Sequence, residues 1–173
     1  MQEIRVELVD NGYIQAFLIY YMVDNPEMDE HQIKSIRLYG FGGVLPFLLA
    51  AAGVHLSSGD AQAFFIKAFL VYGAVILSFV GAVHWGLIIK ADNLDRVSML
   101  LAIGVLPALL GWCALLCPPL ITLLIFSLAF PSLFIYEQFA PVRSLLPDWY
   151  MKLRVQLTII VTFLHFITLS GMV

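Results

Sequence analysis

Charge is what this sequence has least of. Only 12% of its 173 residues are charged, whereas 61% are hydrophobic, and the mean hydropathy is +0.93. A soluble globular domain carries about 25% charged residues, roughly twice that share. The shortage excludes an ordinary soluble domain and places the chain in the membrane class.

Several chemical motifs are missing as well. The net charge is only −3 and no basic stripe with interleaved aromatic residues is present, so nucleic acid is not an expected partner. The two cysteines, Cys113 and Cys117, lie four residues apart, which is not the spacing of a metal or redox site. The sequence has no phosphate-binding loop, zinc motif or Ser-His-Asp pattern. We therefore predict no catalytic residues, no metal and no cofactor in this chain.

Long apolar runs are what the sequence does contain. About 20 apolar residues cross a bilayer, and five stretches qualify. Each must be helical, because unpaired backbone groups cannot face hydrocarbon. The sequence thus predicts an all-α integral membrane protein with five transmembrane helices in a bundle. They cover residues 38–56, 68–89, 97–117, 118–136 and 155–173, with Pro46, Pro107 and Pro131 inside them as expected kinks.

Basic residues gather on one side of these predicted helices. Only Lys67 lies near the opposite side. The positive-inside rule then places the N-terminus inside, in the cytoplasm or an organelle matrix, and the C-terminus outside. The basic residues of the inner side are Lys34, Arg37, Lys90, Arg96, Arg143, Lys152 and Arg154.

A polar N-terminal extension precedes the membrane domain. Residues 1–34 hold nine of the 21 charged residues, and residues 35–173 form the membrane domain. "EIRVELV" alternates polar and apolar residues and "DNG" follows, a pattern typical of a β-hairpin. An interfacial amphipathic helix is the alternative for residues 1–23. A lone hairpin is marginal in water, so we expect it to dock on the bundle or on a partner chain.

Small residues mark the second predicted helix as a packing element. Ala74, Ser78, Ala82 and Gly86 recur every four residues, and such stripes favour close helix contacts in lipid. His84 lies on roughly the opposite face, which also carries small residues, so we expect it to be buried in protein. A buried histidine is either a packing residue with a hydrogen bond or a group that binds or titrates.

Aromatic and basic residues meet near the inner level of the bundle. One interpretation is an aromatic belt with positive-inside anchors. The other is a headgroup-level pocket for an anionic lipid or a quinone, with His84 at its floor. Asp148 follows Pro147 and is expected to cap the last helix. The candidate ligand-binding residues are His84, Trp85, Trp149, Tyr150 and Arg154.

A second histidine, His165, lies in the last predicted helix with Thr158, Thr162 and Thr168 near its face. Two histidines on different helices raise the question of haem. His84 is six residues from Lys90, about 9 Å along a helix, whereas His165 is eleven residues from Arg154, about 16 Å. Because the two imidazoles differ in depth, haem is not expected.

Four stretches carry a resemblance to a known family. "GFGGVLPFLLA", "YGAVILSFVGAVHWG", "GVLPALLGW" and "LPDWYMKLRVQLT" resemble the domain of unknown function 3429 family, over about residues 38–170. The resemblance implies a small multi-helix inner-membrane protein, bacterial or mitochondrial, and supplies no activity. It implies motif positions at Gly81, His84, Trp85, Pro107, Trp112, Trp149, Tyr150 and Arg154.

Two functions are compatible with this reading of the sequence. The first is a non-catalytic auxiliary or assembly subunit of a larger inner-membrane complex, such as a respiratory complex, whose partners are membrane lipids and other membrane-protein chains. The second is a small-molecule protein that binds a lipid or quinone at an inner-side pocket around His84, as a transporter or an enzyme. The sequence favours the first, because it has close-packing stripes and a short extension that needs a partner.

Overall fold

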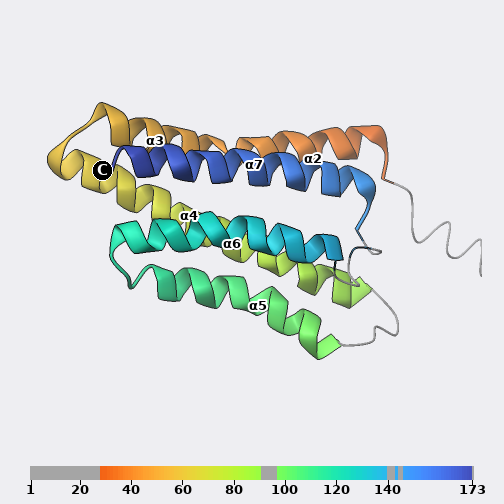
Figure 1. Cartoon of the computed structure of the whole chain (residues 1–173). Helices are drawn as coiled ribbons and strands as arrows, with labels where there is room; N and C mark the ends of the chain where they lie inside the picture. Colours follow the sequence, from red (N-terminus) through yellow and green to blue (C-terminus); the bar gives the residue numbers. More distant parts are fainter. Residues whose placement is uncertain (1–27, 91–96, 140–142, 144–145, 173) are drawn as a thin grey trace, which may run out of the picture. The chain divides into compact units, whose positions relative to one another are not determined.

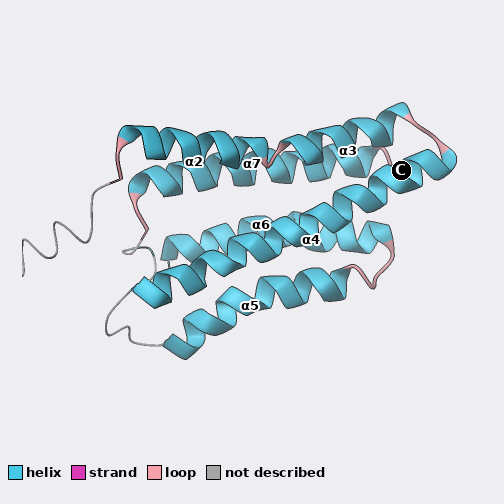
Figure 2. Cartoon of the chain, turned by 180° about the vertical axis from the view of Figure 1, so that it is seen from behind, coloured by secondary structure: helices cyan, strands magenta, loops and turns pink. Residues whose placement is uncertain are grey.

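The computed structural model of this chain describes residues 28–90, 97–139, 143 and 146–172 (Figure 1). The chain divides into two units, residues 1–36 and Arg37–Val173. Within the described residues the regular structure is helical throughout (Figure 2), and the hairpin predicted for residues 1–23 lies outside them. The helices are α2 (Glu30–Gly42), α3 (Leu45–Leu56), α4 (Gly59–Lys90), α5 (Val97–Ala114), α6 (Pro119–Phe139) and α7 (Asp148–Ser170).

Length and composition confirm the membrane class. Among the described residues, four helical segments are long and apolar enough to cross a bilayer, and Ser98–Ala114 is a shorter apolar helix. The protein is therefore a multi-pass membrane protein whose described part is all-helical. The four long segments are Glu30–Leu56, Gly59–Ile89, Pro119–Phe139 and Asp148–Ser170.

Two helices begin earlier than the apolar runs predict. α4 starts at Gly59 and α7 at Asp148, because a helical backbone continues past the apolar stretch into residues such as Lys67 and Lys152. With 32 residues, α4 is about 48 Å long, which exceeds the roughly 30 Å hydrocarbon core. α5 ends before residue 117, because the next residues form the tight turn that leads into Pro119.

The first predicted helix is broken into α2 and α3. Pro46 has no amide hydrogen and so cannot donate to the carbonyl of Gly42, four residues earlier. It lies in the first turn of α3, not in the interior of a helix as predicted. The hydroxyl of Tyr72 on α4 donates to the neighbouring carbonyl, that of Gly43 at the break, at 2.8 Å. A neighbouring helix therefore satisfies the backbone at the break.

The start of α2, in the first unit, is a reciprocal capping box. The amide of Gln32 donates to Asp29 Oδ1 at 2.7 Å, and the amide of Asp29 donates to Gln32 Oε1 at 3.0 Å. Two amides that lack helical partners are satisfied in this way. Asp29 therefore stabilises the start of α2.

α4 is the central helix of the second unit, in contact with α3, α5 and α6, while α7 packs on α3 and α6. The core between them is rich in phenylalanine. Phe47 from α3 packs edge-on against Phe69 of α4 and Phe130 of α6, with ring centroids 5.0 and 6.4 Å apart. This packing orders α3, α4 and α6 around one apolar centre.

α4 and α5 approach most closely at two glycines. A methyl group on Gly81 would lie 2.9 Å from the backbone oxygen of Gly104, and Pro107 also packs there. Nearer the other end of α5, Gly111 packs against Ala74. Ser78 donates to its own helix, and Ala82 and Gly86 are exposed. The close contact with α5 therefore involves Ala74 from the predicted stripe together with Gly81 from outside it.

Candidate functional site

Polar side chains converge at one end of the bundle, which we call the Arg143 end. Here α4 and α6 end and α7 begins, whereas the α5–α6 turn marks the opposite, Cys117 end (Figure 1). An apolar cluster around Leu100, Leu146 and Met151 fills the Arg143 end, with Tyr136 and Tyr150 packed against it. This cluster excludes water from the polar groups described next.

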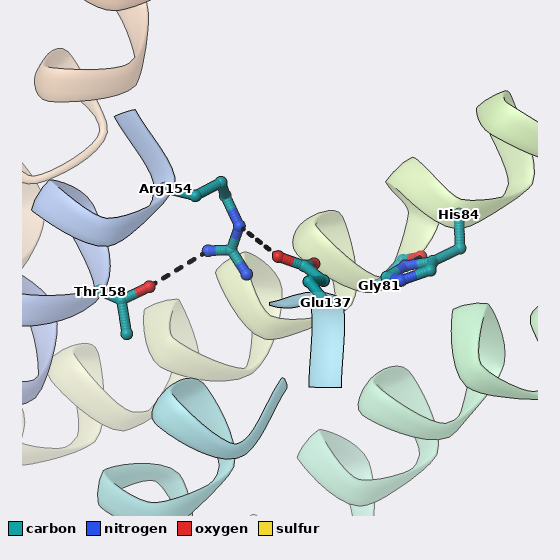
Figure 3. A network of polar contacts seen from close by, with 5 residues as sticks. All are labelled: Gly81, His84, Glu137, Arg154 and Thr158. Atoms are coloured by element: carbon teal, nitrogen blue, oxygen red, sulfur yellow. Dashed lines mark hydrogen bonds and ion pairs between the residues drawn. The ribbon is translucent and has the colours of Figure 1, made fainter. Parts of the chain in front are cut away.

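The centre of the site is a buried ion pair. Arg154 Nε on α7 donates to Glu137 Oε2 on α6 at 3.1 Å, and only 6% and 1% of the two residues is exposed. Arg154 Nη1 lies 3.4 Å from the hydroxyl of Thr158, and Nη2 is buried with no partner in the part of the chain that the structure describes (Figure 3). The charge of the guanidinium is therefore balanced by Glu137, while Nη2 remains available to donate a hydrogen bond. We call such a buried polar atom, without a hydrogen-bond partner, open.

His84 supplies the third polar group, from α4. Its Nδ1 lies 3.1 Å from the carbonyl oxygen of Gly81. Because a carbonyl only accepts, this hydrogen bond places a hydrogen on Nδ1, which leaves Nε2 as an acceptor in the ring with one hydrogen. Among the described residues Nε2 has no partner, and His84 is 1% exposed. In the view of Figure 3, Glu137 lies between Arg154 and His84.

The fourth group is Tyr136, next to Glu137 on α6. Its ring centroid lies 6.2 Å from that of His84, and its hydroxyl is buried and has no partner within residues 28–90, 97–139, 143 and 146–172. The site therefore holds three open polar atoms, contributed by α4, α6 and α7. Two can donate, Arg154 Nη2 and the Tyr136 hydroxyl, and one can accept, His84 Nε2.

The site lies close to the ends of the helices that form it. Glu137 is two residues from the end of α6, about 3 Å, and Arg154 is six residues into α7, about 9 Å. The pair therefore lies within about two helical turns of the ends of these helices.

The other predicted site residues lie around this centre. Trp85 is 44% exposed, and its indole covers the backbone of Gly104. Trp149 and Tyr150 are half-buried at the start of α7, with perpendicular rings 6.0 Å apart. The structure thus brings His84 and Arg154 toward one centre, while the indole of Trp85 faces α5.

Asp148 differs from its predicted role. It is the first residue of α7, after Pro147, and makes no side-chain capping bond. Its Oδ1 instead accepts a hydrogen bond from Arg143 Nη2 at 2.7 Å, and Arg143 Nη1 donates to the carbonyl of Leu146. Arg143 therefore draws the carboxylate toward the preceding segment and secures the approach to α7.

The sequence analysis did not identify Glu137 as the partner of Arg154. A signal existed, since Glu137 is the only charged residue in the 21 residues of α6. A lone carboxylate in so apolar a helix needs a cation nearby. The identity of that cation depends on how α6 and α7 are placed in space.

His165 occupies a different environment in the apolar core. Its Nδ1 lies 2.8 Å from the carbonyl of Val161, and its Nε2 is buried without a partner. Three phenyl rings surround it, those of Phe47, Phe69 and Phe130, with centroids 5.9, 4.9 and 5.5 Å away. Across the described residues, no group of three or more metal-ligating side chains occurs.

The Cys117 end contains a cavity of about 480 Å³ between α4 and the α5–α6 turn. Its lining is largely apolar, and the hydroxyl of Thr122 there is already bonded to the carbonyl of Ala114. Lys67 is its one charged lining residue. The open polar atoms described above lie at the other end of the bundle.

Comparison with known proteins identifies the family. Residues 32–170 match the family described as "Protein of unknown function (DUF3429)". The chain belongs to the DUF3429 family. A relative is Transmembrane protein 69 of Xenopus tropicalis, 33% identical over 135 residues, which cover 75% of this chain and 51% of the relative. The chain thus spans about half the length of that relative. No solved structure matches the chain.

Proposed function

We propose that this DUF3429 protein binds a small membrane-soluble molecule, a lipid or a quinone, at the polar site of the Arg143 end. The supporting observation is the buried Glu137–Arg154 pair beside His84, with three polar atoms left open. Ionisable residues within membrane segments are costly and mark functional sites by default. This proposal covers a binding protein, a transporter or an enzyme alike.

A purely structural role explains the site less well. Leaving one buried donor or acceptor without a partner costs about 1–3 kcal/mol. Three such atoms come from helices that also bury an ion pair, and an apolar cluster of similar volume would cost less. Binding a polar headgroup would supply the missing hydrogen bonds.

The same proposal fixes an orientation and a location. The five helical segments are proposed to cross the membrane with the N-terminus inside, so that the Arg143 end lies at the inner leaflet. The membrane proposed is the inner (cytoplasmic) membrane of a bacterium or the mitochondrial inner membrane. The ligand would then enter from the inner leaflet.

The role as an auxiliary subunit of a larger complex stays a prediction. It depends on residues 1–34, of which the structure describes residues 28–34, and on partner chains. Deleting residues 1–34 should abolish co-purification with a partner while leaving the bundle folded. Unchanged complex formation would count against that role.

The test of the binding proposal is mass spectrometry of protein purified from its native membrane in mild detergent. His84→Leu is the test variant and His165→Leu the matched control, since both histidines are buried and leave Nε2 open. We expect wild type and His165→Leu to carry the same stoichiometric small molecule and His84→Leu to lose it. If the molecule stays on His84→Leu, or if only partner chains co-purify, the proposal is wrong.

A further inference from the structure

We infer that the ligand of this site is electrically neutral and presents a hydroxyl group to His84 Nε2. The inference rests on the proposed function and specifies its ligand class. The shared chemistry is a hydroxyl carried by a membrane-soluble molecule, found in a quinol and in a diacylglycerol alike. An anionic phospholipid is excluded from the class.

The charge of the site argues against an anion. Arg154 is already paired with Glu137 at 3.1 Å, so the two side chains together carry no net charge. Arg143 is likewise paired with Asp148. An incoming phosphate would gain no unpaired cation from these four residues and would bring its charge near the Glu137 carboxylate. Burying a charge without a counter-ion is costly, so a phosphate is disfavoured.

The hydrogen-bonding pattern of His84 favours a ligand with a hydroxyl group. Its Nδ1–H is committed to the Gly81 carbonyl, so Nε2 can only accept a hydrogen bond while the ring is neutral. A ligand that fits must therefore bring a donor. Phosphate esters without a proton, and quinone carbonyls, bring acceptors only. A quinone would leave Nε2 unsatisfied, and the quinol would not.

The two other open atoms of the site are donors, which a ligand hydroxyl group can also satisfy. A hydroxyl that donates to His84 still has lone pairs on its oxygen. The Tyr136 hydroxyl and Arg154 Nη2 are the open donors of the site. The Tyr136 ring lies beside that of His84, so a hydroxyl group that donates to Nε2 would accept from the Tyr136 hydroxyl. This would reduce the number of open atoms from three to one.

The experiment measures binding of four probes to purified protein in phosphatidylcholine nanodiscs. The probes are a short-chain benzoquinol, its oxidised benzoquinone, dioleoylglycerol and dioleoyl phosphatidic acid. We expect the quinol or the diacylglycerol to bind at least about tenfold tighter than the quinone and the phosphatidic acid, the ratio for one unsatisfied acceptor. Whichever hydroxyl probe binds identifies its source.

Variants tie the preference to the site. His84→Leu should abolish the preference, and His165→Leu should keep it. If His84→Leu does not fold, Tyr136→Phe keeps the ring, removes one donor and should weaken the hydroxyl probe by about fivefold to tenfold.

The outcomes separate this inference from the proposed function. If the quinone or the phosphatidic acid binds as tightly as the hydroxyl probes, in a His84-dependent manner, the inference is overturned and the proposed function stands. If no probe shows His84-dependent binding, both are overturned.

Discussion

At the scale of single residues, the two buried histidines show how environment decides a role. Both use Nδ1 to donate to their own helix, and both leave Nε2 open. His165 is surrounded by phenylalanine rings, whereas His84 lies beside Tyr136 near an ion pair. The first environment offers a ligand no further hydrogen bonds, and the second does.

His165 should therefore be replaceable. We expect His165→Leu to leave the free energy of unfolding unchanged or to raise it by up to about 1 kcal/mol, because it removes a buried acceptor that lacks a partner. Thermal or denaturant unfolding in detergent measures this. A loss above about 2 kcal/mol would mean that Nε2 has a partner in the native membrane.

Breaking the buried ion pair should be far more harmful than breaking the exposed one. Arg154→Met leaves the Glu137 carboxylate buried and uncompensated, which should cost about 3–5 kcal/mol. Adding Glu137→Gln should recover most of that loss. The control is Asp148→Asn in the exposed pair with Arg143, with an expected cost of at most about 1 kcal/mol. Equal effects in the two pairs would contradict the burial argument.

At the scale of elements, the crossing of α4 and α5 positions His84. The carbonyl that accepts from His84 Nδ1 belongs to Gly81, and the Cα of Gly81 faces the backbone of Gly104. The imidazole is therefore oriented by a residue that is itself fixed by helix packing.

Gly81→Ala tests this crossing. Its methyl group would lie 2.9 Å from the Gly104 carbonyl oxygen, a backbone atom that cannot rotate away, so α5 must shift. We expect a loss of about 1–3 kcal/mol in stability together with weaker ligand retention. Gly86→Ala is the control, since nothing lies within 4 Å of its added methyl. It should be neutral or stabilising by up to about 1 kcal/mol.

At the scale of the whole molecule, topology can be checked through the natural cysteines. Cys117 lies in the α5–α6 turn and is exposed. In a Cys113→Ser background, a membrane-impermeant maleimide should label Cys117 from the outside only. A cysteine at Lys152, exposed near the start of α7, should react only in inverted vesicles. Labelling of both positions from one side would contradict the proposed orientation.

The sequence predicts which segments are helices better than it predicts which side chains of different helices contact one another. Apolar runs locate the helices, because burial in lipid depends on composition alone. The break at Gly43 cannot be predicted in this way. An apolar span of sufficient length does not reveal that Pro46 lies in the first turn of a new helix. Apolar runs do not predict the pairing of Glu137 with Arg154 either, because that pairing depends on the placement of α6 against α7. A stripe of small residues likewise does not reveal that Gly81 faces α5 while Gly86 stays exposed.

The most direct measurement is the ¹⁵N NMR spectrum of labelled histidine in the purified protein, which has four histidines. A His84 variant assigns the resonance. We predict a hydrogen on Nδ1 of His84, as its contact with the Gly81 carbonyl requires, and an Nε2 resonance that moves when the ligand or the quinol is added while that of His165 does not. A hydrogen on Nε2, or an Nε2 resonance unmoved by a molecule that binds, would contradict the account.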